Sequence, residues 1–204
     1  MPKKVDHDAR RREIADALLA LAAAEGLESV SLRHVAAAAG VSMGAVQHYF
    51  HTKDEMLQFA LRHQAQRREQ RIIARLTARG REPTVREIVR TVLIEVLPVD
   101  ELRRKEYLAG VAFFIRGLRD PPMAATLAEG GPQLHAYFAE LLGRAAREGR
   151  LSEGVDVHQE AVMLWALANS QCISIVLGER TAEQAVATID YQLDRLFPPV
   201  EAPD

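Results

Sequence analysis

Cysteine is almost absent from the sequence, and the shortage excludes two kinds of stabilised fold. A single cysteine, Cys172, among 204 residues permits no disulfide within the chain and no cysteine pairs for a structural zinc site. Because Cys172 stands in a strongly apolar run, we expect it to be a small buried side chain. Apolar residues make up 48% of the chain, which is enough for a large core.

Long apolar runs are also missing. The most apolar segments, residues 107–115 and 161–177, are too short for a membrane span or are interrupted by Asn169, Ser170 and Gln171, whereas a bilayer needs roughly 20 apolar residues. Residues 1–12 are polar and charged, with no apolar stretch behind them of the kind that a secretory signal contains. We therefore expect a cytoplasmic protein with no membrane partner.

The motifs of common enzymes are the third absence. The sequence contains no G-x-S-x-G, no H-E-x-x-H and no glycine-rich phosphate loop. His48 and His51 are three residues apart, but no third ligand stands near them, so we expect no metal site and no cofactor. We predict that the protein is not an enzyme. A helical enzyme or small-molecule-binding protein without DNA binding remains the alternative, because distant residues can form a site that no motif reveals.

Helical periodicity, in contrast, runs through the whole sequence. Apolar residues recur at spacings of three and four between glycine, proline and capping residues, without strand-like alternation. Capping boxes are predicted at Thr52–Glu55, Thr84–Glu87 and Thr181–Gln184. We predict an all-α fold of roughly nine or ten helices, with a helix broken at Gly130 and Gly131.

Residues 29–57 are the most informative stretch. Ser31 is suited to cap a helix in which Leu32, Val35, Ala36 and Ala39 share one face, and Gly40 ends that helix. Ser42 is suited to cap a second, short helix. There Val46 and Phe50 face inward, and the outward side chains are small or polar. Two helices around such a turn form a helix-turn-helix that places its second helix in the DNA major groove, or a hairpin that only packs.

This stretch resembles the DNA-binding domain of the TetR family of transcriptional regulators. The resemblance rests on the run AGVS at residues 39–42, on YF at residues 49–50, and on Lys53 three residues later. It implies an N-terminal three-helix helix-turn-helix domain, residues 1–51, and a larger helical ligand-binding and dimerisation domain, residues 52–204. It also implies a repressor that binds palindromic double-stranded operator DNA as a homodimer and is released by a small-molecule inducer.

The predicted DNA contacts combine the outer face of the second helix with the ends of its neighbours. They are Ser31, Arg33, Ser42, Met43, Gly44, Gln47, His48, Tyr49 and Lys53. The base-side residues among them are Arg33, Met43, Gln47 and His48, and Gln47 is able to pair with adenine through two hydrogen bonds. We expect Ser31, Tyr49 and Lys53 to hold phosphates and Gly44 to mark the closest backbone approach. Generic phosphate contacts are also expected from Lys3, Lys4, Arg10, Arg11 and Arg12.

Charge is distributed unevenly along the chain. Residues 1–80 hold 13 Lys and Arg against 9 Asp and Glu, and residues 81–204 hold 13 against 19. This asymmetry favours nucleic acid binding by the N-terminal part. The largest basic cluster, residues 62–71, lies beyond the hairpin, and we interpret most of its arginines as a solvated helix face.

Residues 157–177 predict a helix that is apolar nearly all round and therefore needs neighbours beyond its own domain. The last helix carries an apolar stripe of Val186, Ile189, Leu193 and Leu196. The resemblance implies a dimer formed by a four-helix bundle of these two helices from each subunit. A large monomeric core is the alternative.

Residues with polar or aromatic groups in otherwise apolar helices are the candidate ligand contacts. They are Tyr107, Phe113, Phe114, Arg116, Trp165 and Asn169. Trp165 and Asn169 lie one turn apart and are expected to point toward the same space. The alternatives are core packing for Phe113 and Phe114 and a surface charge for Arg116.

Overall fold

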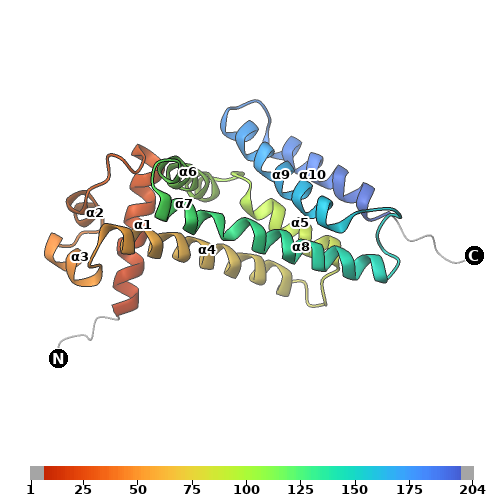
Figure 1. Ribbon diagram of the computed structural model, residues 1–204, viewed down its shortest axis with the longest axis horizontal. Coiled ribbons are helices and arrows are strands. Elements are labelled where there is room, and N and C mark those ends of the chain that lie inside the picture. Colours follow the sequence, from red (N-terminus) through yellow and green to blue (C-terminus); the bar gives the residue numbers. More distant parts are fainter. Residues whose placement is uncertain (1–6, 199–204) are drawn as a thin grey trace, which may run out of the picture. The chain divides into compact units, whose positions relative to one another are not determined.

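The computed structural model describes residues 7–198, and within that range the chain is all α-helical, which confirms the predicted fold class. Figure 1 shows the helices in chain order. Their bounds are α1 His7–Glu25, α2 Leu32–Ala38, α3 Met43–Tyr49, α4 Lys53–Thr77, α5 Val85–Val96, α6 Glu101–Gly117, α7 Pro121–Ala128, α8 Gly130–Arg147, α9 Val157–Val176 and α10 Ala182–Leu196. None of these helices combines the length and apolar character needed to cross a membrane.

The chain divides into two compact units. The first unit contains residues up to Glu69 together with Lys105–Leu127, and the second contains Gln70–Arg104 together with the residues from Ala128 onward. Helices α4 and α6 each contribute to both units. The predicted boundary between residues 51 and 52 is a functional division, and it stays a prediction. By contacts, the first unit continues along α4 because Met56, Leu57 and Ala60 are completely buried in its core.

The first unit is built on a core shared by α1, α2, α3 and the start of α4. Ile14 and Leu18 of α1 and Val35 of α2 are completely buried, and Phe113 of α6 joins the same core. Burial of an aliphatic or aromatic side chain of this size contributes about 1.5–3 kcal/mol. The two short helices are therefore held by packing, since seven-residue helices have little stability alone.

Caps fix most helix starts where the sequence predicts them. Both capping boxes of the second unit, Thr84–Glu87 and Thr181–Gln184, are complete. The box predicted at Thr52 is only half formed. Thr52 Oγ1 accepts from the Glu55 amide at 3.0 Å, but the Glu55 carboxylate accepts from the His51 amide at 2.9 Å instead of from Thr52.

The predicted break between two helices is present, but it lies at Glu129 rather than at Gly130 and Gly131. Helix α8 begins at Gly130, and the preceding Glu129 keeps right-handed helical angles, φ −71° and ψ −34°. Neither glycine takes a positive φ, so neither uses the freedom that would have turned the chain. Helices α7 and α8 therefore follow each other almost without interruption.

The second unit packs α5, α8, α9 and α10 around aliphatic side chains. Completely buried members include Leu93, Leu142, Leu164 and Ile189, and Cys172 is buried with them, as expected. Arg90 holds Asp190 with two hydrogen bonds of 2.5 and 2.8 Å, which join α5 to α10. These bonds also lower the pKa of the Asp190 carboxyl.

A buried carboxylate joins the end of α4 to α5. The Glu95 side chain is fully buried, with Arg71 Nε at 2.6 Å and Arg75 Nη1 at 2.9 Å from its two oxygens. A buried charge is tolerated only when it is paired in this way. Arg71 belongs to the basic cluster at residues 62–71, so this part of the cluster is structural.

Two helices leave apolar residues exposed. On α6, which contains the apolar segment 107–115, Phe114 and Ile115 are 59% and 44% exposed. On α9, exposed residues follow one another at spacings of three and four. This α9 stripe consists of Val162, Met163, Ala166, Ser170, Ile173 and Leu177. The inner side of α9 is buried within the second unit, and no part of residues 7–198 covers the α9 stripe.

Candidate nucleic-acid interface

Helices α2 and α3 form a tight helix-turn-helix. Gly40 has a φ of +65°, and the Gly40 and Val41 amides bond back to the carbonyls of Ala37 and Ala36 at 3.2 and 2.9 Å. This pattern ends α2 with a left-handed residue, for which glycine is the natural choice. Ser42 then caps α3, its Oγ accepting from the Ala45 amide at 3.1 Å.

The inner side of α3 is locked and its outer side is free. Val46 is completely buried and Phe50 is 1% exposed, so α3 cannot rotate about its axis without opening the core. The outer residues, which we call the α3 face, are all exposed: Ser42, Met43, Gly44, Gln47 and His48. All five are predicted DNA contacts, and the structure brings them together on one surface.

Packing within the protein does not require a glycine at position 44. A Cβ built at Gly44 would meet only Ser42 Oγ, at the ordinary contact distance of 3.9 Å, and its φ is not positive. The protein itself therefore has room for a larger residue there. A bare backbone at this point suits close approach by an outside surface.

The predicted phosphate-side residues flank the α3 face. Ser31 caps α2 by accepting from the His34 amide at 3.2 Å, which leaves its own hydroxyl hydrogen able to donate outward. Arg33 is exposed on α2. Lys53 has a second role that the sequence did not indicate, since its Nζ donates to the Val30 carbonyl at 2.6 Å. Partial burial and the nearby Arg116 cation lower the pKa of the Lys53 ammonium.

Tyr49 lies in a cluster of rings that the sequence did not reveal. Its ring is 4.8 Å from that of His7 and 5.2 Å from that of His48, and the two imidazoles are 6.3 Å apart. We call His7, His48 and Tyr49 the ring cluster. It joins the first residue of α1 to the end of α3. Nothing in the local spacing around His7 could have signalled this contact.

Arg11 does not have the free guanidinium expected of a generic phosphate contact. Its guanidinium carbon lies 4.6 Å from the ring centres of both Phe50 and Phe59, and Nη2 donates to Glu55 at 2.8 Å. Two aromatic faces and a carboxylate hold this side chain inside the first unit. Arg10 pairs with Glu13. Lys3 and Lys4 lie outside the described residues.

The middle of α4 is not simply a solvated face. His63 is 7% exposed and its Nε2 lies 3.0 Å from Asp16 Oδ1, to which Arg67 also donates at 2.7 Å. Gln64 is buried as well and donates to the Glu106 carbonyl at 2.7 Å. These contacts fasten α4 to α1 and α6 within the first unit. The interpretation as a solvated face concerned most of the arginines of this cluster, and among them Arg67 is paired with Asp16.

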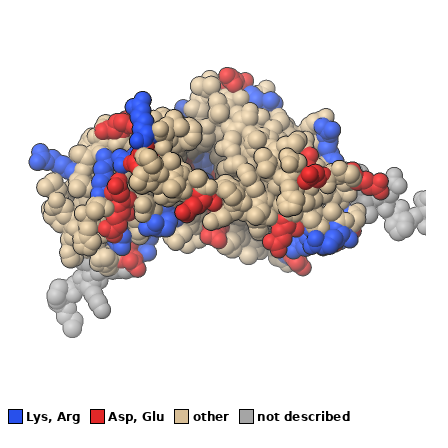
Figure 2. Space-filling view, viewed as in Figure 1, with Lys and Arg blue, Asp and Glu red and all other residues tan. Residues whose placement is uncertain are grey.

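Basic side chains do not gather into one continuous patch on the face shown in Figure 2, where blue and red groups are interspersed. Several arginines of the first unit are already paired, Arg116 with Asp54 at 3.0 Å and Asp120 at 2.7 Å among them. Arg10 and Arg11 are likewise paired, with Glu13 and Glu55, which leaves the net surplus of residues 1–80 unchanged but reduces the number of arginines free to meet phosphates. Sequence counts alone overstate the charge available to DNA.

The six candidate ligand residues are divided between the units. In the first unit, Phe113 is completely buried in the core and Phe114 is 59% exposed, while Tyr107 is half-buried. Phe113 therefore packs in the core, and Arg116 is an ion-paired charge. These are the roles given above as alternatives to ligand contact. In the second unit, Trp165 is half-buried and Asn169 is exposed. The Asn169 amide donates to the Trp165 carbonyl at 2.8 Å, so it is turned to its own helix.

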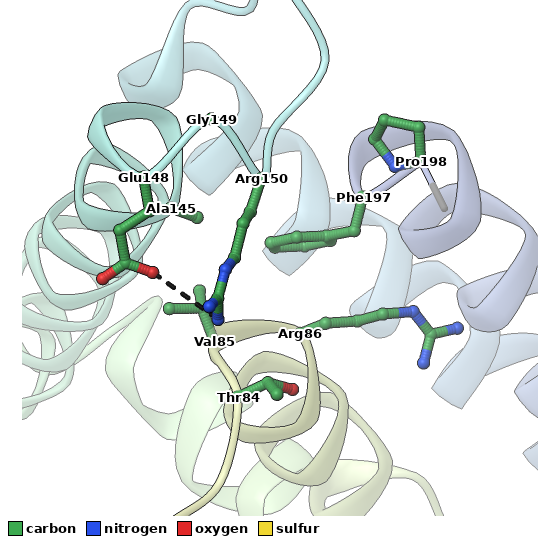
Figure 3. A pocket seen from close by; sticks show the side chains of 9 residues that line it. All are labelled: Thr84, Val85, Arg86, Ala145, Glu148, Gly149, Arg150, Phe197 and Pro198. Carbon is green, nitrogen blue, oxygen red and sulfur yellow. Dashed lines mark ion pairs between the residues drawn. The ribbon is translucent and has the colours of Figure 1, made fainter. Parts of the chain in front are cut away.

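Figure 3 shows an open cavity of about 400 Å³ in the second unit. It is lined by Thr84, Val85, Arg86, Ala145, Glu148, Gly149, Arg150, Phe197 and Pro198. The Arg150 side chain extends beside the Phe197 ring and pairs with Glu148 at 3.7 Å. Arg86 pairs with Asp194 at 2.5 Å. Because both arginines are neutralised, the cavity offers no surplus charge to a ligand, and it contains none of the six predicted contacts.

Two other polar groups of the second unit are buried and have no hydrogen-bond partner among the described residues. Gln171 on α9 is 6% exposed, and its Oε1 has no hydrogen-bond partner among the described residues. His135 Nε2 on α8 is likewise buried without a partner there. A buried polar atom without a partner costs about 1–3 kcal/mol. The sequence signal for Gln171 was a polar amide within an otherwise apolar helix. That signal was interpreted only as evidence against a membrane span.

Metal binding has no support from side-chain grouping. Within residues 7–198, no three His, Cys, Asp or Glu side chains lie together in a way that could hold an ion.

Comparison with known families covers both parts of the chain. Residues 14–59 match the bacterial regulatory proteins of the tetR family, and residues 83–198 match the BetI-type transcriptional repressor C-terminal domain. The chain is 30% identical over 182 residues to the HTH-type transcriptional regulator PksA of Bacillus subtilis, covering 87% of this chain and 83% of that protein. It is 26% identical over 157 residues to the HTH-type transcriptional regulator BetI of Brucella anthropi, covering 76% and 79%.

Solved structures share the same fold. A transcriptional regulator from Rhodococcus sp. Rha1 superposes with a TM-score of 0.73 at 29% identity, covering 90% of this chain and 93% of that one. A regulator from Saccharomonospora viridis, solved in complex with choline, gives a TM-score of 0.81 over 93% and 98% of the two chains. Its identity is 19%, so that likeness bears on the fold alone.

Proposed function

This chain belongs to the TetR family of bacterial transcriptional regulators, with a C-terminal domain of the BetI repressor type, and we propose that it binds operator DNA as a homodimer that a small molecule releases. Membership of this family confirms the prediction of a DNA-binding regulator rather than an enzyme. The dimer, the contacts to DNA and the effector are the proposed parts.

The observation that carries the proposal is the α3 face. Its five residues are exposed, while Val46 and Phe50 on the other side of α3 are buried and fix the helix. A helix held in this way can enter a major groove as a rigid body and present its N-terminal residues to base edges. Gln47 reads adenine, Arg33, Met43 and His48 contact neighbouring edges, and Ser31, Tyr49 and Lys53 hold phosphates.

The α9 stripe supports the homodimer. Val162, Met163, Ile173 and Leu177 are between 44% and 67% exposed, and Ala166 and Ser170 lie between them. An exposed apolar stripe with small residues near its middle allows a second helix to approach closely and bury it. The same stripe on a twofold-related copy is its natural cover. Two α3 faces then lie about 34–36 Å apart and bind the half-sites of a near-palindrome.

The sequence predicts that the apolar stripe of α10 packs against the partner subunit, and the structure gives this stripe a different place. The stripe faces the core of its own subunit, where Ile189 and Leu193 are completely buried and Leu196 is 4% exposed. The side of α10 that remains available to a partner carries Tyr191, which is 65% exposed.

The effector binds in the second unit, where Gln171 and His135 have buried polar atoms without partners. A ligand that forms hydrogen bonds to these two atoms binds more tightly, because it removes the free-energy cost of leaving them unpaired. Trp165, six residues before Gln171 on α9, is half-buried and is the predicted apolar contact in this unit. Choline, which is bound to the regulator from Saccharomonospora viridis, is the first compound to test.

The test is an electrophoretic shift of the full-length protein on the DNA that flanks its own coding region, at physiological salt and with unrelated DNA as competitor. We expect a specific complex of one dimer per near-palindromic site, protected from nuclease over two half-sites one helical turn apart. A monomer by sedimentation that shifts no flanking DNA would overturn the proposal and favour a helical ligand-binding protein.

A further inference from the structure

The ring cluster places two titratable side chains beside the proposed DNA surface. His7 and His48 are exposed and Tyr49 is half-buried, and the three rings lie 4.8, 5.2 and 6.3 Å from one another. His48 belongs to the α3 face, and Tyr49 is a proposed phosphate contact. His7 reaches the same place from the start of α1, although neither the sequence patterns nor the family match, which begins at residue 14, includes it.

The charged surroundings of the cluster contain few acidic groups. Helix α3 has no Asp or Glu, and its only basic residue is His48. The other titratable and charged groups on the first two turns of α1, on α2, at the start of α4 and on the connecting residue are Asp8, Arg10, Arg11, Arg12, Glu13, Arg33, His34, His51, Lys53, Asp54 and Glu55. Of the acidic ones, Glu55 is held by Arg11, Asp54 by Arg116 and Glu13 by Arg10. Asp8 follows His7 directly on α1.

We propose that His7 is a further DNA contact of this protein and that His7 and His48 link operator binding to proton uptake. The inference rests on the α3 face being the DNA surface. A phosphate beside an imidazole favours the charged form of the ring, because an opposite charge within about 4–6 Å stabilises it. Binding of DNA therefore takes up protons at these rings, and by linkage protons tighten the binding of DNA.

The sign of the effect follows from this linkage. The protonated imidazoles interact more strongly with DNA, His7 with a phosphate and His48 as a base-edge contact whose ring lies 5.2 Å from that of the phosphate-holding Tyr49, so operator affinity is highest at acidic pH. The gain is lost as pH rises through the range in which histidine titrates, between about pH 5 and 8. Each linked ring whose titration DNA shifts by one pH unit makes Kd roughly ten-fold tighter at the acidic end of the range.

His7 also positions Tyr49. The contact between the two rings adds to the packing of Tyr49 against the core of the first unit and restrains the part of its side chain that is exposed. A phenylalanine at position 7 would keep this ring contact but could not take up a proton. This substitution therefore separates the proposed charge from the packing.

The experiment measures Kd of the full-length protein for the operator duplex found in the shift assay, by fluorescence anisotropy from about pH 5.8 to pH 8 at constant ionic strength. For the unsubstituted protein we expect Kd to tighten as pH falls. For His7→Phe we expect Kd near that of the unsubstituted protein at pH 8, and a slope of log Kd against pH that is smaller by up to one proton. His7→Ala should show the same loss of slope and a weaker Kd at all pH values.

His158→Gln is the matched control, since His158 is exposed on α9 of the second unit and should leave the slope unchanged. A Kd independent of pH, or a His7→Phe slope equal to that of the unsubstituted protein, would overturn the inference while leaving specific binding at pH 8 intact. Equal loss of slope in His158→Gln would also overturn it. Absence of specific binding at pH 8 would instead overturn the proposed function. Thermal unfolding of each variant confirms that the fold is retained.

Discussion

The α3 face and the α9 stripe are both exposed surfaces on helices whose other side is buried, yet they are chemically opposite. The α3 face offers a hydroxyl, an amide, an imidazole and a bare backbone. The α9 stripe offers aliphatic side chains, with Met163 52% and Leu177 67% exposed. Hydrogen-bonding groups suit base edges and phosphates, whereas a continuous apolar stripe suits a similar apolar surface. Exposure alone therefore does not identify a partner, and the chemistry of the exposed groups does.

The two helices also differ in how they are held. Helix α3 has seven residues and depends on Val46 and Phe50 for its position, while α9 has 20 residues and packs along its inner side. A short helix fixed in a core provides precise orientation and little area. A long helix provides the area that a stable dimer needs. The first unit is suited to recognition and the second to assembly.

The largest effect is expected from a charge on the α9 stripe. Ile173→Glu should convert the dimer to monomers, because burying an unpaired carboxylate in an apolar interface costs several kcal/mol. Operator affinity should fall by about 100-fold or more, since the two half-sites would no longer be bound together. Analytical ultracentrifugation and the shift assay measure the two consequences.

Leu118→Glu is the control for this prediction. Leu118 is as exposed as the α9 stripe, at 68%, but it lies in the first unit just after α6. A dimer that survives Ile173→Glu, or one that Leu118→Glu disrupts equally, would contradict the role given to the α9 stripe.

A smaller and more selective effect is expected on the α3 face. Gln47→Ala should remove about 1–3 kcal/mol of discrimination at one adenine position of each half-site, because two hydrogen bonds to that base are lost. Binding to a panel of single-base operator variants tests this, with Gln159→Ala, an exposed glutamine of α9, as the control. Equal weakening on every operator variant would show that Gln47 does not contact a base.

Local chemistry explains why so much of this fold can be predicted from the sequence. Ser31, Ser42 and Thr84 cap helices as expected, and Gly40 turns the chain with its positive φ. Val46 and Phe50 are buried as the periodicity predicts. All these features depend on residues within a few positions of each other, which is what periodicity and capping rules describe.

Contacts between distant residues could not be predicted in this way. The packing of Arg11 against both Phe50 and Phe59 and the contact of His7 with Tyr49 depend on how helices are oriented in the folded chain. The stripe on α10 shows the same limit. Its periodicity correctly predicts an apolar side, but periodicity does not say whether Ile189 and Leu193 face their own core or a partner. The break predicted at Gly130 and Gly131 lies at Glu129 instead, because glycine permits a turn without requiring one.

Substitution of the buried Gln171 amide in the second unit is expected to stabilise the protein rather than destabilise it. Gln171→Met should raise the free energy of unfolding by about 1 kcal/mol, because an apolar side chain of similar shape replaces a buried group without a hydrogen-bond partner. The same variant should lose its response to effector while keeping operator affinity. Thermal unfolding and operator release measure these outcomes, with Gln159→Met as the exposed control. A destabilised Gln171→Met would show instead that the amide is satisfied in the free protein.

The smallest effect is expected from a surface carboxylate of the second unit, where charge supports stability and not DNA binding. Hydrogen bonds from Arg81 and from the Thr84 backbone lower the pKa of Glu87 to about 2. The folded state therefore favours ionised Glu87, and its contribution is present above about pH 4.5 and is lost as pH falls toward about 2. Because Glu87 and its partners lie near the surface, solvent limits the contribution to below about 1 kcal/mol. Urea unfolding of Glu87→Gln should thus show a small deficit at pH 7 that shrinks by pH 3, and operator affinity at pH 7 should not change. A deficit that stays constant with pH would mean that Glu87 acts by packing rather than by charge.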